Sequence, residues 1–130
     1  MGFFKERKRA KELENSYNEI SAFSKKIEKI SDLSSVDVQS IFNECEIILK
    51  KLESAKQIVS EDLKKSRDVL MNSWFATREA LAYEYNIHQK RLQVLEKYES
   101  ELNAFKTKLL ENGAKVQDNK EETNQAQPGE

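Results

Sequence analysis

Glycine and proline are nearly absent from this sequence. Its 130 residues include three glycines and one proline, and none of them lies between residues 3 and 112. These two residue types interrupt regular secondary structure most strongly. No window alternates apolar and polar residues with the β-branched enrichment that is typical of a strand. The sequence therefore predicts an all-α fold built from long uninterrupted helices.

Cysteine, histidine and long apolar runs are also scarce. Cys45 is the only cysteine, which excludes an intrachain disulfide and favours a reducing compartment. No apolar run approaches the roughly 20 residues that span a bilayer. The N-terminal residues lack the apolar stretch of a secretory signal. These absences predict a cytoplasmic protein.

The residues that build catalytic and metal sites are missing as well. Without internal glycines, no segment has the glycine-rich backbone that cradles a nucleotide. His88 follows Glu84 by one helical turn, which predicts an ion pair or hydrogen bond. A two-metal carboxylate bundle needs Glu-x-x-His pairs on two helices, but position 85 is Tyr85. We expect no catalytic residue, no metal and no cofactor, and an enzyme is the third hypothesis behind two kinds of binding protein.

Charge of one sign does not dominate the chain. There are 22 lysines and arginines against 23 aspartates and glutamates, for a formal net charge of −1. A nucleic-acid-binding protein normally carries a basic face, so nucleic acid is not an expected partner. Charged residues make up 35% of the chain and hydrophobic residues 38%, a composition typical of helices that bury one stripe and solvate the rest.

The first helix is expected from residue 3 to residue 30, where apolar residues recur at heptad spacing. A connector follows at residues 31–35, and Ser34 with Asp37 resembles the capping box that opens a helix. Short helix connections favour antiparallel neighbours. The first helix is therefore expected to fold back on the helical region that follows.

The second helical region is expected from residue 35 to residue 112. Its apolar seam recurs first every three or four positions, then every eleven, and then every three or four again. The seam consists of Val38, Ile41, Cys45, Ile48, Leu52, Ala55, Val59, Leu70, Leu81, Leu92, Leu95, Tyr98, Leu102, Phe105 and Leu109, and Trp74 and Tyr85 are expected to continue it between Leu70 and Leu92. Cys45 is expected to be buried and unreactive because it occupies this seam.

The composition around Ser60 resembles a helix start, but the seam keeps its phase through this site. We therefore favour one continuous or gently bent helix over a break near Ser60, which would give a three-helix arrangement. A continuous helix would span on the order of 115 Å at 1.5 Å per residue. The first helix would cover less than half of that length, so the remainder predicts assembly with another chain.

The C-terminal end of the helical domain is marked by Gly113, a typical helix C-cap. Residues 1–113 are expected to form a single helical domain. Residues 114–130 are polar and lack aromatics, which predicts a disordered tail.

The stretch from residue 69 to residue 87 has apolar residues on nearly every face of the expected helix. Such a helix is surrounded by other helices, either in the thick centre of a bundle or dimer or at a partner-binding surface anchored by aromatics. Its small residues favour close approach of another helix. The candidate interface residues are Val69, Leu70, Trp74, Phe75, Ala76, Ala80, Leu81, Tyr83, Tyr85 and Ile87.

The N-terminal residues combine two phenylalanines with a basic cluster. The residues concerned are Phe3, Phe4, Lys5, Arg7, Lys8, Arg9 and Lys11. Aromatics beside clustered bases suit an interfacial helix at an anionic membrane surface. The competing interpretation is a solvated helix start whose phenylalanines pack on a neighbour.

Together these features predict an elongated coiled-coil-like protein without catalytic equipment. Its expected function is that of a structural or adaptor protein. We expect it to self-associate, most simply as a dimer, or to bind another helical protein. The alternative is a peripheral membrane-surface protein anchored by its N-terminal segment.

Overall fold

The computed structural model of the chain describes residues 2–74 and 77–116, with side chains from residue 5 onward. Within these ranges the protein consists of three α-helices and one short 3-10 helix, without a β-strand. The helices are α1 (Gly2–Glu28), α2 (Val38–Met71) and α3 (Arg78–Glu111), and the 3-10 helix η1 (Leu33–Ser35) lies between α1 and α2. The predicted all-α class is confirmed.

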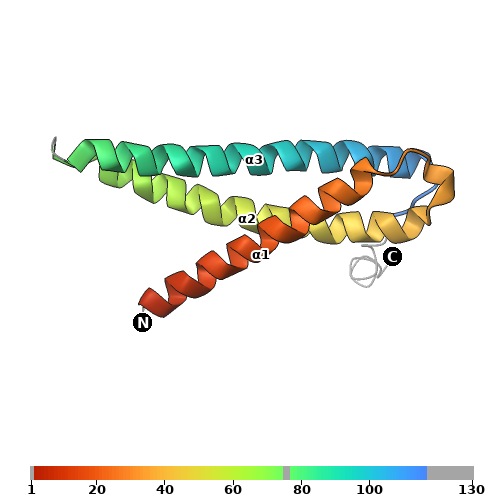
Figure 1. Ribbon diagram of the computed structural model, residues 1–130, viewed down its shortest axis with the longest axis horizontal. Coiled ribbons are helices and arrows are strands. Elements are labelled where there is room, and N and C mark those ends of the chain that lie inside the picture. The colour runs from red at the N-terminus through yellow and green to blue at the C-terminus, as the bar shows by residue number, and fades with distance from the viewer. Residues whose placement is uncertain (1, 75–76, 117–130) are drawn as a thin grey trace, which may run out of the picture.

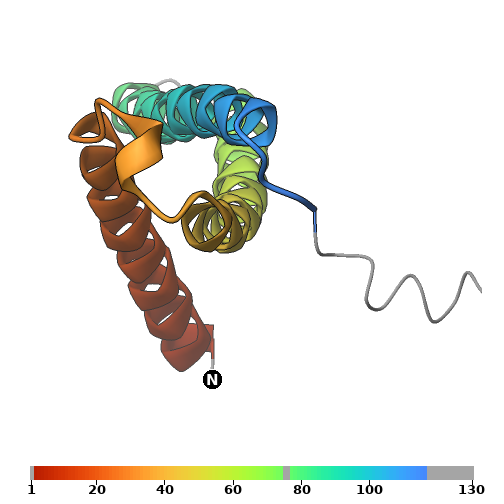
Figure 2. The same cartoon turned by 90° about the vertical axis from the view of Figure 1, so that its right-hand side faces the viewer.

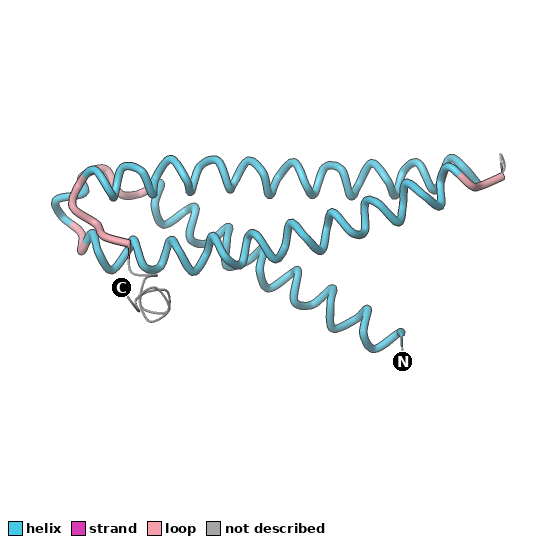
Figure 3. Tube along the Cα trace, turned by 180° about the vertical axis from the view of Figure 1, so that it is seen from behind, coloured by secondary structure: helices cyan, strands magenta, loops and turns pink. Residues whose placement is uncertain are grey.

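The two longest helices, α2 and α3, form an antiparallel hairpin. Figure 1 shows them side by side from the end that holds the α1–α2 connection to their reversal at the opposite end. The α2–α3 contact is the most extensive one, and α1 contacts α2 more than α3. Viewed along the hairpin in Figure 2, α1 is inclined to the other two helices. Its N-terminus points away from them and stops short of the reversal, as Figures 1 and 3 show from opposite sides.

The continuous helix expected over residues 35–112 is wrong. The chain remains helical through Ser60, where a break was weighed, and α2 ends at Met71 instead. The Asn72 side chain donates to the Asp68 carbonyl at 2.8 Å. The Asn72 backbone amide donates to the same carbonyl at 3.2 Å, so the side chain and the backbone of Asn72 together cap the last turn of α2. The reversal that follows lets the apolar seams of α2 and α3 bury each other within one chain.

Aspartates cap the helices of the α1–α2 connection. Asp37 is the N-cap of α2, and its carboxylate accepts from the Ser40 amide at 3.1 Å. The predicted capping box at Ser34 is wrong, because the Ser34 hydroxyl donates to Asp32 at 2.8 Å instead. A carboxylate accepts hydrogen bonds more strongly than a hydroxyl and suits the positive end of a helix.

The core lies in the part of the molecule where all three helices meet, which we call the stem. Its buried apolar residues are Leu13, Ile20, Phe23, Ile41, Phe42, Cys45, Ile48, Leu52, Ala55, Val59, Leu95, Leu102, Leu109 and Ala114. The predicted seam is therefore confirmed from Ile41 to Val59. Phe42 was missed by the seam, although it is fully buried. Each large apolar side chain buried in this way stabilises the fold by about 1.5–3 kcal/mol.

The predicted C-cap at Gly113 is confirmed. Gly113 has a φ of +104°, and the Ala114 amide donates to the Leu109 carbonyl at 3.0 Å. This is the six-to-one bond of a Schellman motif, whose left-handed residue is usually glycine.

The tail begins later than expected, because residues 114–116 dock on the stem. Ala114 is buried, and the Lys115 amide donates to Gln39 Oε1 at 2.8 Å. Gln39 Nε2 in turn donates to the Lys115 carbonyl at 2.9 Å. The two bonds fix the chain after α3 to the start of α2. Residues 117–130, where disorder was predicted, lie outside the described residues.

Candidate protein-interaction site

The end of the hairpin that α1 does not cover exposes large hydrophobic side chains. We call this end the tip and define it as residues 69–74 and 77–87. Its most exposed hydrophobic residues are Val69, Met71, Trp74, Tyr83 and Ile87, with exposed fractions from 36 to 85%. Soluble proteins rarely expose hydrophobic residues in one contiguous group unless the group binds a partner.

The structure brings most of the predicted interface residues together at the tip, although in a different setting. Val69 and Leu70 lie at the end of α2, and Ala80, Leu81, Tyr83, Tyr85 and Ile87 lie at the start of α3. Leu70, Leu81 and Tyr85 are half-buried, whereas Ala80 is exposed. Phe75 and Ala76 lie outside the described residues.

Two expectations for this stretch are wrong. Residues 69–87 do not form the thick centre of a bundle, because the chain reverses within them. Trp74 does not continue the seam, because it lies beyond the end of α2 with 85% of its surface exposed. Both differences have the same cause. A straight helix would keep these apolar residues on one seam, whereas the reversal places some of them on the outside of the hairpin.

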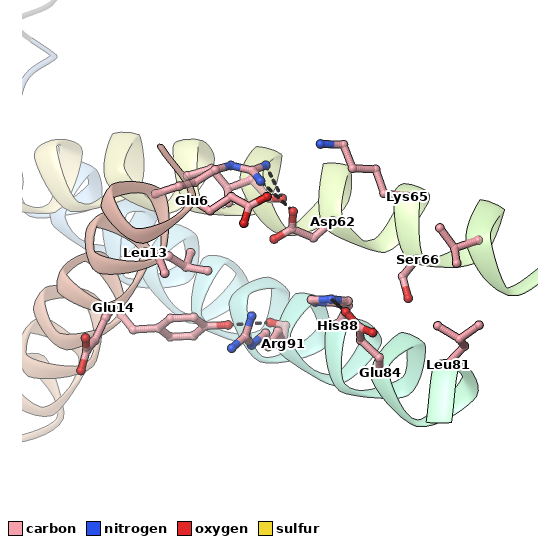
Figure 4. Close-up of a pocket in the computed structure, with 15 residues that line it drawn as sticks. Glu6, Leu13, Glu14, Asp62, Lys65, Ser66, Leu81, Glu84, His88 and Arg91 are labelled. Carbon is pink, nitrogen blue, oxygen red and sulfur yellow. Dashed lines mark hydrogen bonds and ion pairs between the residues drawn. The ribbon is translucent and has the colours of Figure 1, made fainter. Parts of the chain in front are cut away.

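Next to the tip, α1 diverges from the hairpin and borders an open cavity of about 720 Å³, which we call the wedge. All three helices line it. Figure 4 shows Leu13 of α1, Ser66 of α2, and Leu81 and His88 of α3 pointing into the common space. The carboxylates of Glu6, Glu14 and Glu84 also belong to its lining. Arg9, Lys65 and Arg91 line it too, so the wedge combines apolar walls with charged groups of both signs.

One edge of the wedge is held by Arg9. Its guanidinium donates to Asp62 Oδ1 at 2.8 Å, to Glu61 Oε1 at 2.8 Å and to the Ile58 carbonyl at 3.3 Å. Arg9 thus ties the N-terminal half of α1 to α2. Hydrogen bonds to charged groups contribute more than neutral ones, so this contact positions the helix that forms one wall.

The other edge is held by Tyr17, whose hydroxyl donates to the Arg91 carbonyl of α3 at 3.1 Å. Burial is the main cause that raises the pKa of the Tyr17 phenol, and the nearby positive charge of Arg91 partly offsets it. The phenol therefore stays protonated and keeps its hydrogen bond to α3 at neutral pH. Arg9 and Tyr17 together fix α1 against both helices of the hairpin.

Ser66 and His88 place polar atoms in this largely apolar setting. Ser66 is only 8% exposed, and its Oγ has no hydrogen-bond partner within the described part of the chain. The same holds for Nδ1 of His88, whose Nε2 lies 3.8 Å from Glu84 Oε2. The predicted approach of Glu84 to His88 is thereby confirmed. Ser66 follows Val59 by seven residues, so its heptad position could have revealed its burial.

The predicted burial of Cys45 is confirmed. Its thiol lies 3.7 Å from the Leu102 carbonyl, to which it donates a weak hydrogen bond. Burial is the main cause that raises the pKa of this thiol to about 11. A neutral thiol of this kind is a poor nucleophile and a poor metal ligand.

The N-terminal basic cluster is only partly available to another surface. Lys5, Lys8 and Lys11 are exposed, but Arg9 is engaged with α2. The side chains of Phe3 and Phe4 lie outside the described residues.

The described residues hold no group of three or more His, Cys, Asp or Glu side chains placed to bind a metal ion. None of the helices, as far as the chain is described, is long and apolar enough to cross a membrane. Comparisons of the chain with protein-family models, with curated proteins and with solved structures found no match.

Proposed function

We propose that this chain is a non-enzymatic structural or adaptor protein that acts through coiled-coil-type helix association, first of all with a second copy of itself. The observation that carries the proposal is the exposed hydrophobic tip. Trp74 and Tyr83 are its most exposed aromatics. Tryptophan and tyrosine dominate the binding energy of protein interfaces, because each buries a large apolar area and keeps one polar group.

The stem buries its apolar residues within a single chain. Four ion pairs join its helices, with N···O distances of 2.7–2.9 Å, and they are Lys26–Glu44, Lys51–Glu19, Lys56–Glu99 and Lys106–Glu46. Exposed pairs of this kind stabilise by at most about 1 kcal/mol each, so the buried core carries most of the stability there. At the tip only two helices pack on each other. A two-helix segment cannot enclose apolar residues on every face, and additional helices would cover them.

The experiment compares two double variants of the full chain by size-exclusion chromatography with light scattering. Met71→Ser with Trp74→Ser removes hydrophobic area from the tip. Ile47→Ser with Val94→Ser is the matched control, because these residues are exposed hydrophobics outside the tip. We expect the tip variant to be monomeric and the control to assemble like the unmodified chain. Assembly of the tip variant at unchanged affinity would refute the proposal, and circular dichroism checks that both variants are folded.

Membrane-surface binding through residues 3–11 remains the alternative proposal. Arg9 is less available for it than the sequence suggested, because its guanidinium is held by Glu61 and Asp62. The test is sedimentation with anionic vesicles, using Lys5→Glu with Lys8→Glu as the variant. Loss of vesicle binding in this variant, with unchanged assembly, would favour the membrane alternative over the tip proposal.

A further inference from the structure

The N-terminal half of α3 has exposed apolar residues beside the seam that packs on α2. Ala80, Tyr83 and Ile87 follow each other at three and four positions, and all three are exposed. This is the heptad spacing of a helix surface that packs on another helix. Exposed residues on this side of α3 form what we call the α3 strip, which consists of Glu79, Ala80, Tyr83, Glu84, Ile87, Lys90 and Arg91.

The α3 strip continues, toward the tip, the side of α3 that α1 covers in the stem. Ser24 of α1 donates to Glu101 Oε1 at 3.2 Å, and Glu101 follows Ile87 by two heptads. Tyr17 still reaches α3, at the Arg91 carbonyl where the strip ends. Closer to the N-terminus, the hydrogen bonds of Arg9 all go to α2. Because α1 leaves α3 at this point, as Figures 1 and 3 show, the strip has no helix on it.

The charges of the α3 strip are divided by sign along the helix. Glu79 and Glu84 precede Ile87, and Lys90 and Arg91 follow it. In the stem, lysines and glutamates of different helices pair at 2.7–2.9 Å. Within the described part of the chain, no ion pair joins the four charges of the strip to another helix. A helix with the opposite order of charges would therefore complement the strip.

A second copy of α3 has this order when it runs in the opposite direction. Glu84 precedes Ile87 by three residues, and Lys90 follows it by three. A two-fold axis beside Ile87 thus brings each Glu84 level with the basic residues of the other copy and each Ile87 beside its own counterpart. A parallel pair would instead place acidic residues on acidic ones and basic residues on basic ones. The antiparallel contact uses the same surface on both copies, so it closes as a dimer.

We propose that two copies of this chain dimerise through an antiparallel contact between their α3 strips, with a two-fold axis beside Ile87. This inference rests on the self-association proposed above and assigns it to one side of α3. The turn that holds Trp74 then lies beside α3 of the other copy, which links the contact to the tip. The strip is about 18 Å long at 1.5 Å per residue. A helix pair of this length buries less than the roughly 800 Å² per partner of a standard interface, so the dimer is weak and depends on concentration.

Disulfide cross-linking of the full chain tests the contact. Ile87→Cys places a thiol beside the two-fold axis, within the Cα separation of about 7 Å that a disulfide bridges. We expect mild oxidation to give a covalent dimer on a non-reducing gel. Ile47→Cys is the matched control, because Ile47 is exposed on α2 outside the tip, and it should cross-link more slowly. The unmodified chain should not cross-link, because Cys45 is buried.

Two further cysteine variants test the direction of the helices. Tyr83 and Lys90 lie on either side of the axis, so an antiparallel contact places Tyr83 of one copy near Lys90 of the other. Tyr83→Cys and Lys90→Cys should each give little covalent dimer alone and cross-link efficiently when the two proteins are mixed. Efficient cross-linking of each variant with itself, and not in the mixture, would show a parallel contact and overturn the proposal.

Reversal of charge tests the pairing across the contact. Glu79→Lys with Glu84→Lys makes the strip basic, and Lys90→Glu with Arg91→Glu makes it acidic. Each double variant places like charges opposite each other in its own dimer, so we expect the dissociation constant to rise by about tenfold or more. A mixture of the two places opposite charges together and should restore dimerisation. Sedimentation equilibrium measures both effects.

The failures of the two proposals can be told apart. If the unmodified chain dimerises, but Ile87→Cys cross-links no faster than Ile47→Cys and mixing the charge variants restores nothing, the α3 strip is wrong and self-association stands. If the unmodified chain is monomeric at all concentrations, self-association is wrong and the strip contact falls with it. Circular dichroism of each variant checks that loss of dimer is not loss of fold.

Discussion

Replacing Leu102 by alanine tests the packing of the stem. Leu102 is fully buried on α3, and its carbonyl lies 3.7 Å from the Cys45 sulfur of α2. Alanine removes the apolar atoms of the side chain and leaves a cavity that the surrounding helices fill only in part. For a site this enclosed we expect a loss of about 3 kcal/mol in the free energy of unfolding. At a urea slope of about 2 kcal/mol per M, the midpoint should fall by about 1.5 M.

The matched control is Leu110→Ala, eight residues further along α3, where the side chain is 40% exposed. We expect it to cost less than about 1 kcal/mol, because a large share of its surface already lies in water in the folded state. Both changes are measured by urea unfolding in the Trp74→Ser background, so that dissociation does not contribute. Equal losses in the free energy of unfolding for the two variants, or a larger loss for Leu110→Ala, would refute the conclusion that α3 packs on α2 through the face that contains Leu102.

Three further perturbations follow from single contacts. Arg9→Ala should lower the free energy of unfolding by about 1–2 kcal/mol, and a double-mutant cycle with Asp62→Asn should show coupling; additive effects would contradict the contact. Gly113→Ala should cost about 1 kcal/mol by thermal unfolding, because residue 113 has a positive φ. Cys45 has a folded pKa of about 11 against an ordinary value of 9.0, so its contribution is complete below pH 9.0 and is lost as pH rises toward 11. The stability difference between the unmodified chain and Cys45→Ala should therefore shrink over this window, and a constant difference would contradict the burial of the thiol.

The core of α2 could be predicted from the sequence because burial on a helix depends mainly on spacing. The residues from Ile41 to Val59 recur at three and four positions, and any helix that packs on one side buries them. Phe42 was missed because it lies beside this seam, where residues of other helices cover it; Lys106 Nζ of α3 lies 6.0 Å from the centre of its ring. Its burial therefore depends on the tertiary arrangement.

The reversal after Met71 could not be predicted from the same rules. It contains no glycine or proline among its described residues, and Asn72 caps the helix by donating a side-chain hydrogen bond to the Asp68 carbonyl. The eleven-residue spacing of Leu70 and Leu81 was misleading. These residues lie on opposite helices of the hairpin. The turn between them has a length that leaves the eleven-residue spacing of the apolar residues unchanged in the sequence.

The wedge depends on contacts that the sequence does not indicate. Arg9 was assigned to a membrane-binding cluster, whereas in the fold it pairs with Glu61 and Asp62, more than fifty positions away. The apolar and aromatic residues of the tip could be recognised from composition alone. The cavity could not, because Ser66 and His88 line the same space only when α2 and α3 form the hairpin.

Sedimentation equilibrium of the unmodified chain over a broad concentration range tests the central claim most directly. The claim is that the protein acts through helix association at the tip, and it predicts that the mass rises with concentration from 15.1 kDa toward twice that value. A mass that stays at 15.1 kDa at every concentration would contradict it.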